Sequence, residues 1–145
     1  MMTSKEYLSQ AYLLESRIKV KQEQIEVLRA STQKVTATYG TECVSHSRNV
    51  TTVEDGVIRI NEAQAELNNM HGEMLRLQVE ISEVIISLDN QTHSMILTKR
   101  YLRYLSWNRI ANEMRYTVRW VQKQHGKALK AVDQLLKSRE KEAVI

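Results

Sequence analysis

The segment MILTKRYLRYLSWNRIANEMRYTVRWVQKQHGKALKA, residues 95–131, decides the fold prediction for this chain. It lies in a strongly basic half: residues 91–145 hold twelve Lys/Arg against four Asp/Glu, a net charge of +8. Residues 1–90 hold nine Lys/Arg against thirteen Asp/Glu, a net charge of −4, so the overall charge is only +4. A charge difference of this size between contiguous segments indicates a polyanionic partner for the basic half.

The periodicity of the quoted segment predicts three helices, each with a capping residue at its start. Residues 89–92 offer several caps to a helix over residues 91–104, Ser106 caps a helix over residues 107–114, and Thr117 caps the last helix after a break at residues 115–116. The predicted inward-facing residues of the three helices, in order, are Ile96, Leu97, Tyr101 and Leu105; Trp107, Ile110, Ala111 and Met114; and Val121, Ala128, Leu129 and Val132. This arrangement has the spacing of a helix-turn-helix, with a small residue (Ala111) in one helix, an apolar residue (Val121) in the next and a short turn between the two helices.

The acidic half predicts two long helices with coiled-coil spacing. Apolar residues recur in steps of three and four, with one lysine in the first stripe. The stripes are Tyr7, Ala11, Leu14, Ile18, Lys21, Ile25 and Leu28, and then Ile60, Ala63, Leu67, Met70, Met74, Leu77, Ile81, Val84 and Leu88. We expect them to pair as an antiparallel hairpin, with association against a second copy as the alternative. Lys21 either extends its ammonium to the surface, which we favour, or selects register and partner.

Residues 31–52 between the two stripes have a different composition. They hold nine Ser/Thr in twenty-two residues together with Gly40. Because side-chain hydroxyls compete for backbone hydrogen bonds and β-branching disfavours helix, the helical pattern is predicted to stop here. A flexible connector is favoured over a short strand hairpin between Val35 and Val44 about Tyr39-Gly40. The sequence therefore predicts an all-α fold, with a long antiparallel coiled-coil hairpin over residues 1–90 and a helix-turn-helix domain over residues 91–145.

The C-terminal motif resembles region 4 of sigma-70-type transcription factors, in which a capping Ser/Thr, an Ile-Ala core and a second Thr/Ser open the two helices. The whole layout also resembles small phage late-transcription regulators of the ArpU and RinA kind. The residues that carry this resemblance are 34–39, Arg100-Tyr101-Leu102, Ser106-Trp107, Ile110-Ala111, Tyr116-Thr117, Val121, His125 and Lys127-Ala128-Leu129. Three positions depart from the pattern. Tyr104 and Arg115 stand where such proteins often have glycine in a turn, and Gly126 lies inside the last helix.

The second helix of a helix-turn-helix lies in the major groove with its first two turns toward base edges. The residues predicted to face bases are Val118, Arg119, Gln122 and Lys123. Arg119 can donate hydrogen bonds to guanine O6 and N7, Gln122 can pair with adenine, and Val118 can contact a thymine methyl. Predicted phosphate contacts are Arg115, Thr117, Lys99, Arg100, Arg103, Arg109, Lys127 and Lys130. An ordinary solvated basic surface is the alternative, but only Glu113 offsets nine Lys/Arg between residues 99 and 130.

Nothing in the sequence indicates an enzyme. The four histidines are scattered without metal-ligand spacing, and no glycine-rich phosphate loop or nucleophile motif is present. We therefore expect no metal or other cofactor, and we expect His125 to pack or cap within the last helix. Trp120 is expected to pack rather than to stack at a DNA surface. Cys43 is a lone cysteine and no apolar run is long enough to span a membrane, so a cytoplasmic location in a bacterial host cell is expected.

These features favour a sequence-specific regulator of transcription that binds double-stranded DNA and is encoded by a phage or prophage. The coiled coil would hold a homo-oligomer together, with a dimer favoured, or it would contact RNA polymerase. The alternatives are a small terminase-like DNA-packaging subunit and a purely structural coiled-coil scaffold. The sequence specifies neither the DNA site nor the direction of regulation.

Overall fold

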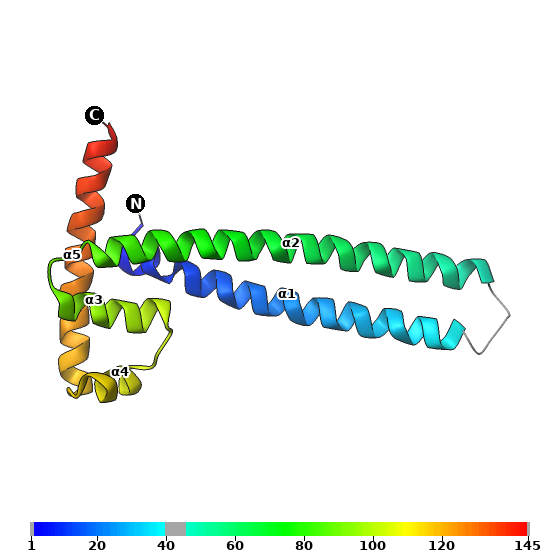
Figure 1. The fold of residues 1–145 in the computed structure, drawn as a ribbon, viewed down its shortest axis with the longest axis horizontal. Helices are drawn as coiled ribbons and strands as arrows, with labels where there is room; N and C mark the ends of the chain where they lie inside the picture. The colour runs from blue at the N-terminus through cyan, green and yellow to red at the C-terminus, as the bar shows by residue number, and fades with distance from the viewer. Residues whose placement is uncertain (1, 40–45, 145) are drawn as a thin grey trace. The chain divides into compact units, whose positions relative to one another are not determined.

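Most of the residues that the structure describes are helical. This computed structural model describes residues 2–39 and 46–144. The elements are α1 (Ser4–Tyr39), α2 (His46–Ile86), α3 (Gln91–Leu97), the π-helical turn η1 (Thr98–Leu102), α4 (Trp107–Met114) and α5 (Val118–Val144). The predicted fold class is confirmed: α1 and α2 form a long antiparallel hairpin, and shorter helices follow it (Figure 1).

Helix α1 begins at Ser4, three residues before the first predicted stripe position, because a capping box precedes it. The Thr3 hydroxyl oxygen accepts a hydrogen bond from the Glu6 backbone N–H at 3.2 Å, and the Glu6 carboxylate accepts one from the Thr3 N–H at 3.0 Å. The Ser4 N–H donates to the Asp133 carboxylate of α5 at 3.0 Å. Two otherwise unsatisfied donors at the helix start are thus paired, and a third ties α1 to α5.

The prediction that helix stops across residues 31–52 was wrong for most of that segment. Helix α1 continues to Tyr39, and α2 begins at His46. A hydroxyl need not break a helix, because it can donate to the carbonyl four residues earlier; the Thr32 hydroxyl does so with Leu28 O at 2.9 Å. Residues 35–39 are helical, which excludes the strand considered there, while Gly40, Val44 and Cys43 lie outside the described residues.

The chain divides into two compact units, Leu14–Glu73 and a second unit of Met1–Leu13 with Met74–Ile145. In the first unit the predicted stripes meet in the hairpin seam, and its buried residues are Leu14, Ile18, Ile25, Ala63 and Leu67. Lys21 is half-buried in this seam and forms an ion pair with Glu66 of the facing helix. A Cβ atom on Gly56 would lie 2.5 Å from the Thr32 hydroxyl oxygen, so α1 and α2 approach closely there.

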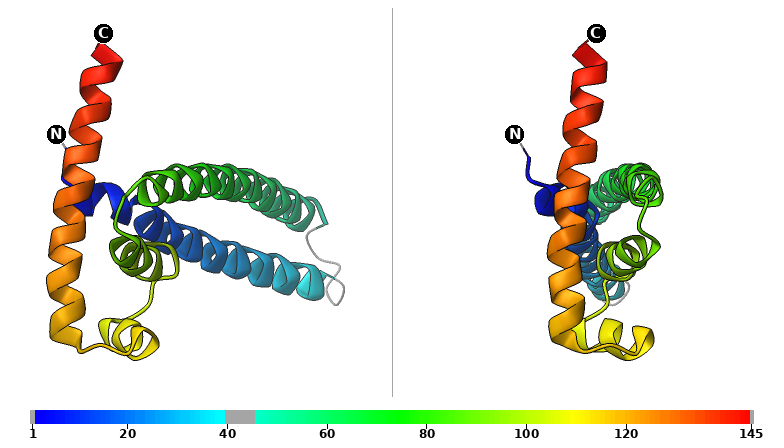
Figure 2. Two further views of the ribbon diagram at one scale, coloured as in Figure 1. Left: turned by 60° about the vertical axis from the view of Figure 1, so that its left-hand side comes forward. Right: turned by 90° about the vertical axis from the view of Figure 1, so that its left-hand side faces the viewer.

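The second unit has two apolar clusters, and the hairpin contributes to the larger one. Its buried residues are Leu8, Ala11, Ile81, Val84, Ile85, Leu97, Tyr101, Ala128 and Val132. Leu8 and Ile85 are off the predicted seam stripes, yet they are 0% and 1% exposed. The smaller cluster holds Ile96, Ile110, Ala111 and Val121. Figure 2 shows α3 and α4 on the same side of the N-terminal part of α5. Helices α4 and α5 and the turn between them are the segment predicted to be a helix-turn-helix.

The helix predicted over residues 91–104 is shorter and less regular than expected. It is α-helical only to Leu97, widens into η1 and ends at Leu102. The Arg103 N–H donates to Thr98 O and the Leu105 N–H donates to Lys99 O, both at 3.0 Å. Tyr104 follows with a left-handed φ of 57°, which turns the chain toward α4. Among the described residues, no helix is long and apolar enough to cross a membrane.

Candidate nucleic-acid interface

Both ends of α4 are capped by hydrogen bonds. The Ser106 hydroxyl oxygen accepts a hydrogen bond from the Arg109 N–H at 3.3 Å, so Ser106 is the predicted N-cap. At the other end Arg115 adopts a left-handed φ of 61°. The Tyr116 N–H donates to Ala111 O at 3.0 Å and the Arg115 N–H to Asn112 O at 3.3 Å, which is a Schellman motif. The two non-glycine residues flagged by the sequence, Tyr104 and Arg115, thus both have positive φ.

The start of α5 is held by a cap and by an aromatic stack. The Thr117 hydroxyl oxygen accepts a hydrogen bond from the Trp120 N–H at 3.1 Å, as predicted. Trp120 packs against the smaller apolar cluster, which confirms the favoured prediction for this side chain. Its ring stacks on Tyr116 with the centroids 3.8 Å apart and the planes at 17°. Tyr116 is 53% exposed, and its stack on Trp120 was not predicted from the sequence.

The inward face of α5 includes a buried histidine. His125 is 9% exposed, and its Nε2 lies 2.7 Å from the Tyr101 hydroxyl oxygen, at hydrogen-bonding distance. Burial, with smaller contributions from Arg100 and Lys5, lowers the pKa of His125 to about 4. Burial also raises the pKa of the Tyr101 hydroxyl. The pair is therefore neutral at pH 7 and joins η1 to α5, in line with the expectation that His125 packs.

The residues predicted to face bases lie on the first two turns of α5. Arg119, Gln122 and Lys123 are exposed there. Val118 is half-buried and packs against the smaller apolar cluster, so only part of its side chain is open to solvent. The first turns of α5 therefore present two cations and one amide to solvent.

Three residues of the predicted phosphate set have partners within the protein. Lys99 Nζ lies 3.6 Å from one Glu113 carboxylate oxygen, and the Lys99 side chain is only 15% exposed. Arg103 Nη1 lies 3.5 Å from the other oxygen of the same carboxylate. Arg100 donates from Nη1 to Leu105 O at 3.0 Å and places its guanidinium 4.4 Å from the centre of a Trp107 ring. Glu113, the one acidic residue between residues 90 and 132, is thus already shared by two cations.

The remaining cations of the helix-turn-helix are exposed and form no ion pair within the part of the chain that the structure describes. We refer to them as the unpaired cations: Arg109, Arg115, Arg119, Lys123, Lys127 and Lys130. An α-helix turns about 100° per residue, so the four of them on α5 fall within an arc of roughly 80°. The buried residues of α5 lie on the opposite side. Thr117, the last predicted phosphate contact, is also exposed beside this set.

Gly126 lies beside the arc of unpaired cations on α5, about 20° outside its edge by helix geometry. The helix continues through it, and a Cβ atom there would meet nothing within 4 Å. Packing within the protein therefore does not require a glycine at this position. The exposed backbone at Gly126 leaves the basic side of α5 open to close approach by another molecule.

The rest of the described chain offers no metal-binding cluster. Among the side chains that the structure describes, no group of three His, Cys, Asp or Glu is arranged to hold a metal ion. No protein-family model matches the sequence, and no curated protein or solved structure matches it either. The interpretation of the helix-turn-helix therefore depends on its own geometry and charge.

Proposed function

We propose that this chain is a sequence-specific regulator of transcription that binds double-stranded DNA and inserts α5 into the major groove. The observation that carries the proposal is the set of six unpaired cations on the helix-turn-helix. Uncompensated, exposed cations repel one another in the free protein, and the phosphates of a duplex relieve that repulsion with release of counterions. The same cations lie on a motif whose second helix has the dimensions of a groove reader.

The exposed side chains at the start of α5 supply the base contacts in this proposal. The guanidinium of Arg119 donates two parallel hydrogen bonds to guanine O6 and N7, and the Gln122 amide pairs with adenine N6 and N7. Lys123 adds a further donor one turn along. Val118 offers its exposed methyl surface to a thymine methyl. Each bidentate contact discriminates against the wrong base by about 1–3 kcal/mol.

Positioning on the backbone falls mainly to cations without an internal partner. Arg115 and Thr117 flank the N-terminus of α5, where free N–H groups and the helix dipole attract phosphate. Arg109, Lys127 and Lys130 extend the contact on either side. Lys99, Arg100 and Arg103 contribute less, because contact with phosphate would cost them their bonds to Glu113, Leu105 and Trp107.

The hairpin serves in this proposal as the assembly element, with a homodimer as the favoured state and RNA polymerase as a further candidate partner. Within Leu14–Glu73, Val20 and Val27 are 65% and 64% exposed and are spaced by one heptad on α1. Apolar side chains repeated at this spacing on an outer helix face can pack against a helix of a second copy. The resemblance to phage late-transcription regulators supports a phage or prophage origin.

Selection from a random duplex library with the full-length protein tests the proposal. Full length is required because residues 91–145 alone lack Leu8, Ala11, Ile81, Val84 and Ile85 of the core. We expect an enriched motif, with loss of preference at one guanine in the Arg119→Ala variant. Recovery of unenriched DNA by both proteins would contradict base recognition.

The mass of the protein in solution separates regulation from packaging. A dimer supports a regulator, whereas a ring of about eight or more protomers with the same DNA preference would support a packaging subunit.

A further inference from the structure

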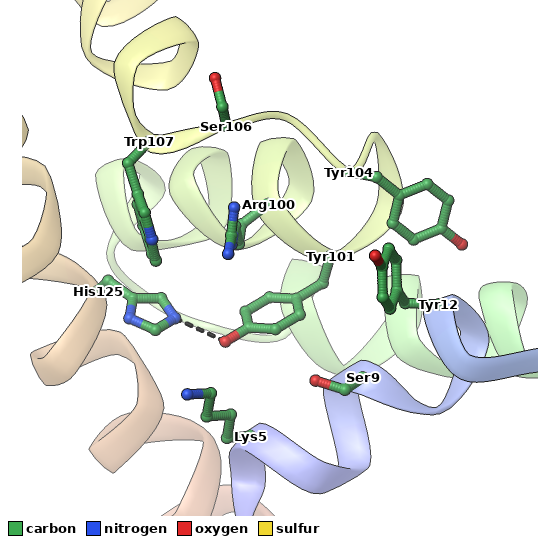
Figure 3. Close-up of a pocket in the computed structure, with 9 residues that line it drawn as sticks. All are labelled: Lys5, Ser9, Tyr12, Arg100, Tyr101, Tyr104, Ser106, Trp107 and His125. Carbon is green, nitrogen blue, oxygen red and sulfur yellow. Dashed lines mark hydrogen bonds between the residues drawn. The ribbon is translucent and has the colours of Figure 1, made fainter. Parts of the chain in front are cut away.

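A cavity of about 440 Å³ lies inside the second unit, away from the exposed arc of α5. It is lined by residues of α1, η1, α4 and α5 and by the turn after η1 (Figure 3). The lining residues that matter for its chemistry are Lys5, Ser9, Arg100, Tyr101, Trp107 and His125. A volume of this size is in the range of small-molecule sites.

The cavity is cationic. Lys5 and Arg100 line it from different elements, and no carboxylate lines it. Lys5 is exposed and makes no ion pair with any residue that the structure describes. A guanidinium carries five N–H donors. Among the residues that the structure describes, Arg100 donates one hydrogen bond, from Nη1 to Leu105 O, so further donors remain for a ligand. Arg100 and Lys5 also both lower the pKa of His125, which places their charges close to the buried imidazole.

The walls of the cavity are aromatic. The Trp107 ring meets the His125 ring edge-on with the centroids 4.7 Å apart, and the Tyr101 ring stacks on His125 at 5.6 Å. Because the His125 imidazole is neutral at pH 7, it adds hydrogen-bonding capacity without a fixed charge. In Figure 3 the Lys5 ammonium and the Ser9 hydroxyl lie on the side of the cavity facing Tyr101 and His125. Flat walls beside two cations suit a ligand with a ring and an anionic group.

We propose that this cavity binds a small anion built on a flat ring, in which a phosphate or carboxylate is held by Lys5 and Arg100 and the ring lies against the aromatic wall. The guanidinium offers a two-pronged contact to either anionic group. The occupant contacts both helices of the helix-turn-helix, through Trp107 of α4 and His125 of α5. The inference does not depend on DNA binding. Arg100 is the one group that it shares with the predicted phosphate contacts, and Lys5, Trp107 and His125 are not among them.

Calorimetric titration of the full-length protein without DNA tests the proposal. Adenosine 5′-monophosphate and benzoate serve as phosphate and carboxylate probes, and adenosine and inorganic phosphate each lack one half of the recognised chemistry. We expect one or both ring-bearing anions to bind at about 1 mM or tighter. Adenosine and inorganic phosphate should bind at least about tenfold more weakly. Absence of binding by both ring-bearing anions, or equal binding of adenosine, would overturn the proposal.

Two further measurements locate the bound probe. Lys5→Gln should weaken binding about tenfold, because it removes a charged donor from an exposed position whose loss leaves the fold intact. Lys141→Gln removes the same charge from the exposed end of α5 and should change nothing. In NMR spectra the indole N–H signal of Trp107 should shift on binding, while that of Trp120, which does not line the cavity, should stay in place. Equal affinity of the Lys5 and Lys141 variants, or shifts confined to Trp120, would refute the site.

Discussion

The hairpin unit Leu14–Glu73 and the helix-turn-helix differ in the balance between their basic and acidic residues. Residues 14–73 hold seven Lys/Arg and nine Asp/Glu, and the described ion pairs Lys19–Glu15 and Lys21–Glu66 lie within this unit. Residues 99–130 hold nine Lys/Arg and one Asp/Glu, and Glu113 neutralises only Lys99 and Arg103. A surface on which both signs of charge are mixed is stable in water without a charged partner. A surface whose charges are mostly of one sign attracts a partner of the opposite sign. The comparison supports the proposal that the helix-turn-helix contacts nucleic acid and the hairpin serves assembly.

The largest expected effect comes from the core beneath the unpaired cations. Ile110→Ala removes a fully buried side chain from the smaller cluster and should lower the free energy of unfolding by about 2–5 kcal/mol. Ile58→Ala on the hairpin, where the side chain is 52% exposed, should change it by less than about 0.5 kcal/mol. Urea unfolding of both variants checks the difference. Equal losses would show that the two regions do not differ in the way described.

Burial of His125 makes the free energy of unfolding of the second unit depend on pH in the acidic range. The pKa of His125 is about 4 in the folded protein and about 6.5 when unfolded, so between these values the unfolded chain binds more protons. Stability is therefore lost as the pH falls from 6.5 toward 4, by up to about 1.4 kcal/mol per pH unit. Urea midpoints from pH 7 to 4.5 measure this. Carboxylates also titrate in this range, so the readout is the flatter profile of His125→Gln, and identical slopes would contradict the assignment.

The left-handed residue at the end of α4 gives a smaller effect. Arg115→Gly relieves the strain of a positive φ and should raise stability by about 0.5–1 kcal/mol relative to Arg115→Ala. Both variants lose the same cation, so both should lower DNA affinity equally. Thermal unfolding compares their stabilities and a DNA titration compares their affinities. A glycine variant no more stable than the alanine variant would show that the turn is not strained.

The smallest expected change removes the one acid among the cations. Glu113→Gln releases Lys99 and Arg103 from their shared carboxylate, at a cost of at most about 1 kcal/mol because Glu113 is partly exposed. DNA affinity should rise a few-fold and depend more steeply on salt, since two further cations become available to phosphate. Glu66→Gln, which breaks the Lys21 pair of the hairpin, is the control and should leave DNA affinity unchanged. Equal behaviour of the two variants would remove the distinction between the regions.

Features fixed by neighbouring residues could be predicted from the sequence. The caps at Ser106 and Thr117 follow from hydroxyl chemistry beside an apolar period, and the bounds of α4 match the prediction. The left-handed residue Arg115 was flagged by the resemblance, because it stands where such proteins often have glycine. The Tyr116–Trp120 stack was missed, although two aromatic residues at i and i+4 are a signal that could have found it.

Features that depend on distant contacts could not be predicted in this way. Leu8 and Ile85 are buried by the C-terminal helices, and a seam period within one helix carries no information about a third helix. The pairing of Lys99 and Arg103 with Glu113 links η1 to α4, so sequence spacing could not separate these cations from the unpaired ones. The helices that extend through the Ser/Thr-rich segment show that local propensity is a weak prior beside a long continuous helix.

The salt dependence of DNA binding tests the central claim most directly. Fluorescence anisotropy of the full-length protein with a duplex of selected sequence should show log Kd changing linearly with log salt. The slope should be on the order of four, because four of the unpaired cations, Arg109, Arg115, Lys127 and Lys130, contact phosphate in the proposal. Lys127→Ala should reduce that slope by about one, and Lys21→Ala on the hairpin should leave it unchanged. Binding that is absent, that does not respond to salt, or that loses the same slope in both variants would contradict the account.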